Sequence, residues 1–253
     1  MNTNTTAPAP ASATSRVQRV RHDVRRRELR VLRVETLSPH FRSITFGGPE
    51  LAGFISASFD DHLKFIIDAG GPAQAMRDYT PRRYDPAAGE LTIEFALHGA
   101  GPAADWAAAA APGQTATVGG PRGSFIIPLD YDWHLLVGDE TAMPAIARRL
   151  EELPSGARAT VIVQAGDPAD ERNFTSAAAV NLQWVRTSAA LVDAVKALQL
   201  PWGEGYAWCA GEATTTATLR SILVDDKGHN RHAIRAAAYW KQGAAAHHEN
   251  LEG

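Results

Sequence analysis

The sequence predicts an all-β domain followed by an α/β domain, because the pattern of apolar residues changes once along the chain. From Leu29 to about Phe125, short segments alternate apolar and polar residues with a period of two, which is typical of half-buried strands. From about Asp132, apolar strand-like segments alternate with helical ones, which favours a parallel sheet covered on both faces. The length of 253 residues suits two domains of ordinary size.

The first domain is predicted from strand segments separated by turns rich in glycine and proline. These segments span residues 31–38, 40–46, 62–68, 90–97 and 114–120, with one helical segment at 102–110. Many short strands with little helix favour a small antiparallel barrel.

The second domain is predicted from strands at 134–140, 159–165, 182–186, 205–212 and 233–240, with helices at 143–154, 189–200 and 214–228. The composition changes near Pro128–Asp132, so we place the two domains at residues 21–130 and 131–253. Residues 1–20 begin with a stretch of Thr, Ala, Pro and Ser that cannot bury a core and lacks the features of a signal peptide, so we expect a disordered tail.

Composition limits the class of protein. A net charge of −3 suits a cytoplasmic protein and argues against a dedicated nucleic-acid binder, which is usually basic. No run of about 18 apolar residues occurs, so we expect no membrane insertion. The single cysteine, Cys209, cannot form an internal disulfide or hold an iron–sulfur cluster; we interpret it as a small buried residue. Any electron transfer would therefore need an organic cofactor.

Arginines are concentrated before and within the first predicted strand. Two interpretations stay open: a solvated lead-in to the strand, or a patch that attracts an anionic ligand or partner. The residues are Arg16, Arg19, Arg21, Arg25, Arg26, Arg27, Arg30 and Arg33.

One group of candidate binding residues lies in the segment from Arg77 to Arg82. A flavin nucleotide needs an aromatic plane beside its ring, a hydroxyl or amide near the reactive N5 atom, and cations on its phosphates. Alternate residues of a strand point to one side, so Arg77 and Tyr79 can act on one ligand, with Thr80 beside them. An ordinary exposed strand carrying arginines is the alternative.

Two glycine turns are candidate phosphate sites. The strand at 90–97 runs through His98, Gly99 and Gly101 into a helix that opens with Pro102 and Ala103. The unpaired N–H groups and positive dipole of a helix N-terminus suit a pyrophosphate. The second turn, at 119–125, contains Gly123 and Ser124 and carries one cation, Arg122.

In the second domain, two strands each end in a turn that opens a helix. Gly138, Asp139, Glu140 and Thr141 form the first turn, and Gly211 and Glu212 form the other. Dinucleotide phosphates bind in this position in doubly wound sheets, although the sequence lacks the GxGxxG pattern.

Six motifs in one order resemble the siderophore-interacting protein family of the ferredoxin–NADP reductase superfamily. They are RxYTxR, HGxGPAxxWA, GGPRGSF, GDETAxPAI, AGEA and YWKxGxxxHHE, and they span about Arg30 to Glu249. The resemblance implies a six-stranded antiparallel FAD-binding barrel and an α/β domain that binds NADH or NADPH.

The resemblance also implies roles for individual residues. Tyr79 would lie against the isoalloxazine and Thr80 near its N5, as the residues closest to the reaction. Arg82 would contact the phosphates or the flavin edge, while Trp106 packs as a core aromatic behind the pyrophosphate turn. Pro81 departs from the apolar residue expected there, which puts the strand pairing in question. The cofactor-binding set is Arg77, Tyr79, Thr80, Arg82, His98, Gly99, Gly101, Pro102, Ala103, Gly123, Ser124, Gly138, Asp139, Glu140, Thr141, Gly211 and Glu212.

The implied substrate is a ferric siderophore, and the implied activity is its reduction. A flavin accepts two electrons from NAD(P)H and can release them singly to iron(III), so the protein itself needs no metal site. Many ferric siderophores are anionic, and we expect Lys64, Arg122 and Lys241 to line the cavity over the flavin. Alternatives are a general flavin or ferredoxin-type reductase and a non-catalytic siderophore-binding flavoprotein. We expect a monomer.

The choice between NADH and NADPH depends on charges near residues 164–172. Asp167, Asp170 and Glu171 would repel a 2′-phosphate and Arg172 would attract it, so the sequence slightly favours NADH. A metal site at His247, His248 and Glu249 is a further alternative, disfavoured because adjacent residues are poorly placed to bind one ion.

Overall fold

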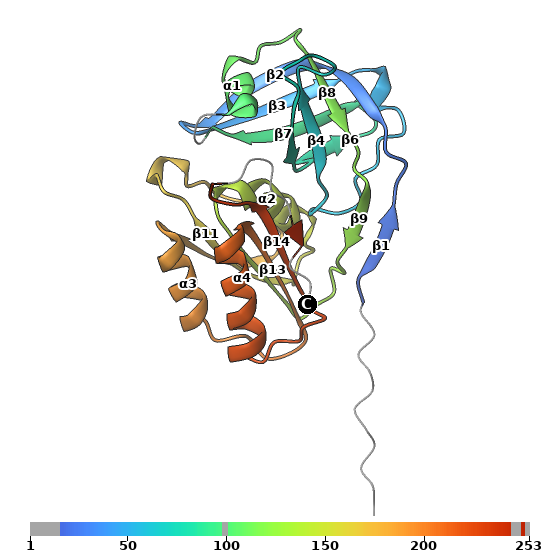
Figure 1. Cartoon of the computed structure of the whole chain (residues 1–253). Helices are drawn as coiled ribbons and strands as arrows, with labels where there is room; N and C mark the ends of the chain where they lie inside the picture. Colours follow the sequence, from blue (N-terminus) through green and yellow to red (C-terminus); the bar gives the residue numbers. More distant parts are fainter. Residues whose placement is uncertain (1–15, 98–100, 244–248, 251–253) are drawn as a thin grey trace, which may run out of the picture.

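The computed structural model describes residues 16–97, 101–243 and 249–250. It has two domains, with an antiparallel β domain above an α/β domain in Figure 1. The predicted fold class is therefore confirmed, and the predicted boundary at residue 130 falls between strands β9 and β10. No helix in the described part of the chain is long and apolar enough to cross a membrane.

The β domain is built on one curled antiparallel sheet in the order β5-β4-β8-β2-β3-β7-β6. The predicted six strands become seven because Pro81, which has no N–H for a strand ladder, lies between β5 and β6. These consecutive strands lie at opposite edges of the sheet, so residues 80–82 cross its seam. The bounds are β2 (Arg26–Ser38), β3 (Phe41–Gly47), β4 (Leu63–Ile67), β5 (Ala75–Tyr79), β6 (Arg83–Asp85), β7 (Glu90–Ala96) and β8 (Thr115–Gly119).

Aromatic and aliphatic side chains fill the inside of the curled sheet, and helix α1 (Pro102–Ala109) lies against them. Trp106 of α1 packs 4.7 Å from Phe65 and stacks on Phe46 at 6.1 Å, measured between ring centroids. The interpretation of Trp106 as a core aromatic is confirmed.

A two-stranded antiparallel ribbon runs from the barrel alongside the second domain (Figure 1). It pairs β1 (Gln18–Arg21) with β9 (Gly123–Ile126). The predicted tail over residues 1–20 was therefore too long, because residues 18–20 belong to a strand; residues 1–15 lie outside the described part.

The arginine run is divided between several environments. Arg16 forms ion pairs with Asp130 and Glu204, and Arg33 pairs with Glu90. Arg27 is buried with its guanidinium on backbone carbonyls. These three arginines thus stabilise the chain around β1 and β2 through ion pairs and hydrogen bonds.

The α/β domain contains a parallel five-stranded sheet with a short antiparallel strand added at one edge, in the order β12-β11-β10-β13-β14-β15. Its strands are β10 (Trp133–Gly138), β11 (Arg158–Gln164), β12 (Ala179–Val185), β13 (Gly205–Glu212), β14 (Ile234–Trp240) and β15 (Glu249–Asn250). Its helices are α2 (Met143–Glu152), α3 (Ser188–Ala197) and α4 (Ala213–Ser221).

Helices cover both faces of this sheet, as the continuous apolar runs predict. Side chains from alternate strand positions, such as Leu136 and Trp208, pack toward α2. The positions between them, including Cys209, pack toward α3 and α4. Cys209 is fully buried, which confirms its interpretation as a core residue.

The two domains share a core as well as ion pairs. Phe41 and Phe59 of the β domain belong to the hydrophobic cluster beneath α2, and the Phe59 ring lies 5.4 Å from that of Trp208. Asp60 forms an ion pair with Arg235 of β14, and both side chains are buried. The segment that precedes β4 therefore docks the barrel onto the second domain.

Candidate functional site

The strand β5 brings two predicted binding residues to one face. Tyr79 pairs with buried Leu63 and Arg77 with buried Phe65, so both side chains point to the side where the barrel core lies. The Tyr79 ring lies 4.4 Å from the Phe95 ring. Burial raises the pKa of the Tyr79 phenol well above its ordinary value, so this residue stays protonated near neutral pH. The predicted pairing of Arg77 with Tyr79 on one face is confirmed.

Helix α1 offers a free N-terminus in the same part of the barrel. Its first residues, Gly101 and Pro102, have no side-chain cap on the opening N–H groups. A Cβ added to Gly101 would meet no described atom within 4 Å, so the described part of the chain leaves space beside this turn. Ala103, also in the predicted set, is buried in the first turn. His98 and Gly99 lie outside the described residues.

These features fit a flavin dinucleotide. Tyr79 and Trp106 pack on the same two rings, Phe65 and Phe95, so β5 and α1 share one part of the barrel core. In the described part of the chain, the guanidinium of Arg77 is bonded to its own strand, at the Met76 carbonyl. An aromatic ring, a cation without a carboxylate partner and open N–H donors are the groups that a flavin diphosphate requires.

Thr80 lies at the junction of the two domains. It is buried, and its side chain lies beside Tyr239 of β14. The Tyr239 hydroxyl also donates to Asp60 Oδ1 at 3.1 Å. Burial raises the pKa of Tyr239 well above its ordinary value. The residue predicted nearest to the reacting flavin atom therefore contacts the domain predicted to bind the nicotinamide.

Arg82 is engaged elsewhere than predicted. Its Nε donates to Glu94 at 3.0 Å, and its two terminal nitrogens donate to Glu151 of α2. The side chain is 14% exposed. Because β5 ends before Pro81, Arg82 turns from the flavin strand toward α2 and joins the domains. The structure does not support the expected contact of Arg82 with the phosphates.

The carboxyl ends of β10, β13 and β14 meet around a buried carboxylate, Asp139. Its Oδ1 accepts from the N–H of Thr141 at 2.9 Å, and its Oδ2 accepts from the N–H of Glu212 at 2.9 Å. The indole N–H of Trp240 also donates to Oδ2, at 2.8 Å. Burial raises the pKa of Asp139. The predicted residues Asp139, Thr141 and Glu212 are thus brought together, and Trp240 is a member that sequence reasoning missed.

Two predicted glycines allow these strand ends to pack closely. A Cβ on Gly138 would lie 2.4 Å from the Cβ of Ala142, and one on Gly211 would lie 2.4 Å from Asp139 Oδ2. Gly211 also has φ +143°, which L-residues rarely adopt. Glu140 accepts a bond from the N–H of Gly166, and Glu212 caps helix α4 at Thr215. This edge is the position at which parallel sheets bind dinucleotides.

The third turn has a structural role that differs from the prediction. The Ser124 hydroxyl donates to Asp61 at 2.8 Å, accepts from the N–H of Ala57 at 3.2 Å and lies 2.8 Å from His22 Nε2. One donor and two acceptor sites are then all used. Gly123 is required because a Cβ there would lie 2.4 Å from the Val20 carbonyl. The Ser124 hydroxyl therefore has no hydrogen-bonding capacity left for the cofactor in this arrangement.

The three predicted acceptor-side cations are all exposed, but they differ in setting. Lys64 is 48% exposed and pairs with Asp78 at 2.6 Å, on the face of the β4–β5 hairpin opposite Arg77 and Tyr79. Arg122 follows Gly119, the strand partner of Lys64, by three residues, so these two lie in neighbouring parts of the barrel. Lys241 directly follows Trp240 at the end of β14. Their convergence on one ligand stays a prediction.

The charges that favoured NADH are already paired. Asp170 is buried and accepts from Ser38 and His40 of the barrel. Arg172 donates to Glu94 at 2.7 Å, and Glu171 pairs with Arg186. Asp167 accepts from the N–H of Ala169 at 2.8 Å and lies 3.9 Å from His40 Nδ1. All four charges in the sequence argument thus have partners within the protein.

The described residues contain no group of three or more His, Cys, Asp or Glu side chains placed to hold a metal ion. His247 and His248 lie outside the described part.

The described residues have the two-domain fold of ferredoxin reductases. A ferredoxin reductase of carbazole 1,9a-dioxygenase shares the fold at 18% identity with a TM-score of 0.64, covering 86% of this chain and 70% of that one. The family model for the siderophore-interacting FAD-binding domain matches residues 30–75 and 68–125, and the model for siderophore-interacting protein matches residues 131–243. The chain belongs to the siderophore-interacting protein family, and its first domain is a FAD-binding domain.

Relatives of the same length are known. The NADPH-dependent ferric-chelate reductase of Escherichia coli is 39% identical over 245 residues, covering 88% of this chain and 96% of the relative. The ferric vibriobactin reductase of Vibrio cholerae is 30% identical over 251 residues, covering 88% and 93%. A siderophore utilization protein from T. fusca is 31% identical with a TM-score of 0.86, covering 92% of this chain and 98% of that one.

Proposed function

We propose that this protein is an NADPH-dependent reductase of ferric chelates, with a ferric siderophore as its substrate. The observation that carries the proposal is that the flavin strand ends beside Tyr239 of the α/β domain, whose hydroxyl donates to Asp60 of the barrel at 3.1 Å. Tyr239 directly precedes Trp240, which reaches the strand edge at Asp139. A flavin held on β5 would thereby lie next to a nicotinamide held at that edge.

Each part of the site has a distinct task in this proposal. FAD, when bound, takes two electrons together from the nicotinamide and passes them on singly to iron(III). Tyr79 supports the ring, while Arg77 and the N-terminus of α1 hold the diphosphate. Glu212 and Asp139 shape the nucleotide edge around Gly211. The barrel and the α/β domain shield the reacting atoms from water where Thr80 is buried.

Replacing Tyr79 by alanine is expected to weaken FAD binding about tenfold, because an aromatic contact contributes roughly 1 kcal/mol beyond area burial. Titration of the apoprotein with FAD, followed by flavin fluorescence, measures this. Tyr84→Ala is the matched control, since Tyr84 is also a barrel aromatic, packed 4.9 Å from Phe54. Equal FAD affinity in Y79A and wild type would remove Tyr79 from the site.

NADPH is proposed as the donor because the E. coli relative carries that specificity in its name, and the acidic residues that favoured NADH are paired. Arg186 follows β12 at the carboxyl edge of the sheet, and its side chain is 44% exposed. Arg186 pairs with Glu171 at the surface, and we assign it to the 2′-phosphate on the premise that the phosphate replaces this carboxylate.

Replacing Arg186 by alanine is expected to raise the KM for NADPH about tenfold, because a charge-assisted phosphate contact is lost. The KM for NADH should not change, since NADH has no 2′-phosphate. Steady-state kinetics with both nucleotides measures the two values. If both rise equally, Arg186 serves the fold and not the specificity.

Steady-state turnover with an iron(II) trap tests the proposed function. The protein, FAD and NADPH are incubated with ferric complexes of catecholate, hydroxamate and citrate types, and trapped iron(II) is recorded. We expect at least one ferric chelate to be reduced faster than a redox dye or free flavin. Faster reduction of dye or flavin than of every chelate would indicate a general flavin reductase. A flavin that NADPH fails to reduce would indicate a non-catalytic binding protein.

A further inference from the structure

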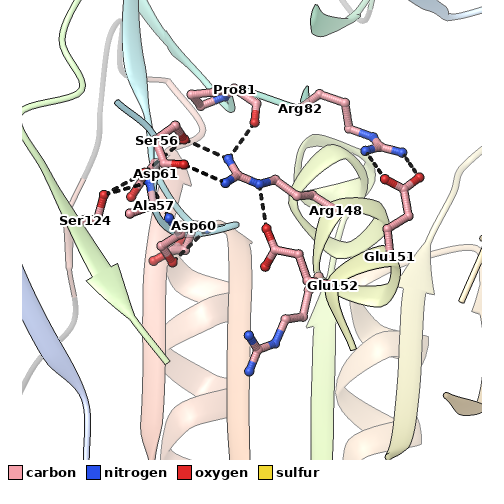
Figure 2. Close-up of polar contacts among 12 residues, drawn as sticks. Ser56, Ala57, Asp60, Asp61, Pro81, Arg82, Ser124, Arg148, Glu151 and Glu152 are labelled. Atoms are coloured by element: carbon pink, nitrogen blue, oxygen red, sulfur yellow. Dashed lines mark hydrogen bonds and ion pairs between the residues drawn. The ribbon is translucent and has the colours of Figure 1, made fainter. Parts of the chain in front are cut away.

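Arg148 of helix α2 reaches from the α/β domain into the barrel (Figure 2). One terminal nitrogen donates to Ser56 Oγ and to the Pro81 carbonyl, both at 2.8 Å. The other donates to the Ser56 carbonyl at 3.0 Å. Nε pairs with Glu152 at 2.9 Å, one turn along the same helix. The side chain is only 13% exposed, so these contacts are well shielded from water.

The two residues that Arg148 holds are the two ends of one hairpin. Strands β4 and β5 pair antiparallel, with Leu63 opposite Tyr79 at the open end. Ser56 precedes β4, and Pro81 follows β5. The hairpin forms an edge of the sheet, where β5 pairs with β4 alone. A single guanidinium therefore fixes both ends of the hairpin that carries Arg77 and Tyr79.

The segment after β5 depends on such side-chain contacts. Strand pairing stops at Tyr79 and resumes at Arg83, so no ladder bonds fix residues 80–82. Thr80 lies beside Tyr239. Pro81 is held by Arg148 and Arg82 by Glu151 of α2 (Figure 2). Two of these three contacts come from α2.

The other end of α2 lies at the nucleotide edge. The helix begins at Met143, just after the turn in which Asp139 accepts from Thr141. Arg148 lies five residues into the helix, about 8 Å along its axis at 1.5 Å per residue. A short helix is stiff over this distance, so the nucleotide turn and the flavin strand are joined by one rigid element.

We propose that Arg148 is a positioning residue for the flavin site, which holds the β4–β5 hairpin and Thr80 in register with the nucleotide edge. The inference rests on the proposed function in that it takes β5 as the flavin strand. Arginine suits the role because its planar fork binds two carbonyls and a hydroxyl in fixed directions. A lysine in its place keeps the charge but not this geometry.

The contact with Ser56 links Arg148 to further residues of the barrel. The Ser56 hydroxyl donates to Asp61 at 3.0 Å, and Asp61 also accepts from Ser124. The whole segment before β4 is thus part of one hydrogen-bonded network that ends on α2 (Figure 2). Loss of Arg148 would leave the Pro81 carbonyl without this partner and free the hairpin to shift.

The test compares Arg148→Gln and Arg148→Lys with two matched variants. Arg149→Gln removes a neighbouring guanidinium that also binds two backbone carbonyls, those of Ile127 and Pro128. This guanidinium packs on the Phe59 ring, but these hydrogen bonds reach neither Ser56 nor Pro81. Glu152→Gln removes the helix partner of Arg148 and leaves its three other bonds. The readouts are the FAD dissociation constant of the apoprotein, the visible circular dichroism of bound flavin, and the melting temperature.

We expect R148Q to bind FAD about tenfold or more weakly and to change the flavin circular dichroism, since several charge-assisted bonds are lost together. The FAD affinity of R148K should lie between those of R148Q and wild type, and that of E152Q should match wild type. R149Q should lower the melting temperature while its FAD affinity stays within about twofold of wild type. If R148Q does not fold, the FAD affinity and flavin circular dichroism of R148K decide the test.

Two outcomes would overturn the inference: unchanged FAD affinity and dichroism in the Arg148 variants, or an equal loss in R149Q. Neither readout uses NADPH or a ferric chelate. A wild-type protein that binds FAD but reduces no chelate would refute the proposed function and leave the role of Arg148 standing. If the wild type reduces ferric chelates but the Arg148 variants bind FAD normally, the role of Arg148 is refuted and the proposed function stands.

Discussion

Asp60→Ala is expected to destabilise the protein by about 3–5 kcal/mol, the cost of leaving a buried charge without its partner. The change removes the ion pair with Arg235, whose side chain is 7% exposed while that of Asp60 is 1% exposed. It also removes the acceptor for the Tyr239 hydroxyl. Chemical denaturation followed by tryptophan fluorescence measures the loss.

A second substitution separates charge burial from lost packing. In the double variant D60A/R235M the uncompensated cation is gone, so most of the stability should return. Glu90→Ala is the matched surface control, because it breaks the exposed pair with Arg33 and should change stability little. If D60A costs no more than E90A, the buried pair does not hold the domains together.

Replacing Lys64 and Arg122 together by alanine is expected to raise the apparent KM for an anionic ferric chelate about tenfold or more. Each partly exposed charge contributes roughly 0.5–2 kcal/mol at an effective dielectric between those of water and the protein interior. High salt should raise the apparent KM of the wild type for the chelate and change that of the double variant much less. Flavin reduction by NADPH should stay near wild type, because these residues need not contact the nicotinamide.

The pairing of Lys64 with Asp78 sharpens this test. Asp78 offsets the charge of Lys64, so Asp78→Asn should lower the KM for an anionic chelate, opposite in sign to the double variant. Arg30→Ala with Arg33→Ala removes the same net charge from β2 and should leave the KM unchanged. If K64A/R122A slows flavin reduction by NADPH and flavin oxidation by the chelate equally, the flavin site is damaged. Unchanged acceptor kinetics would exclude both residues from the substrate site.

Features that depend on local pattern were predictable. Period-two alternation located the strands that became β2, β3, β4, β7 and β8, and the continuous apolar runs located the buried parallel sheet. The expected shared face of Arg77 and Tyr79 follows from the pleat alone. The burial of Cys209 and the packing of Trp106 against the barrel core followed in the same way from their place in apolar segments.

Features that depend on distant partners were not predictable. Arg82 shares a motif with Tyr79, but its direction is set by Glu151, which is 69 positions away, and by the break at Pro81. Trp240 meets Asp139 across 101 positions, with no local signal to connect them. The charges at Asp170 and Arg172 suggested a nucleotide contact because a sequence does not show that both are paired with the barrel.

The central claim is that electrons pass from NADPH through FAD to a chelated iron(III), and an anaerobic two-step mixing experiment tests it most directly. The FAD-loaded protein is first mixed with one equivalent of NADPH, and the visible flavin absorbance is followed. A ferric chelate is then added, and flavin absorbance and trapped iron(II) are recorded together. The account predicts bleaching by NADPH and then recovery of the absorbance, with two iron(II) formed for each flavin because a two-electron carrier reduces a one-electron acceptor. Bleaching with no recovery on addition of any ferric chelate would contradict it.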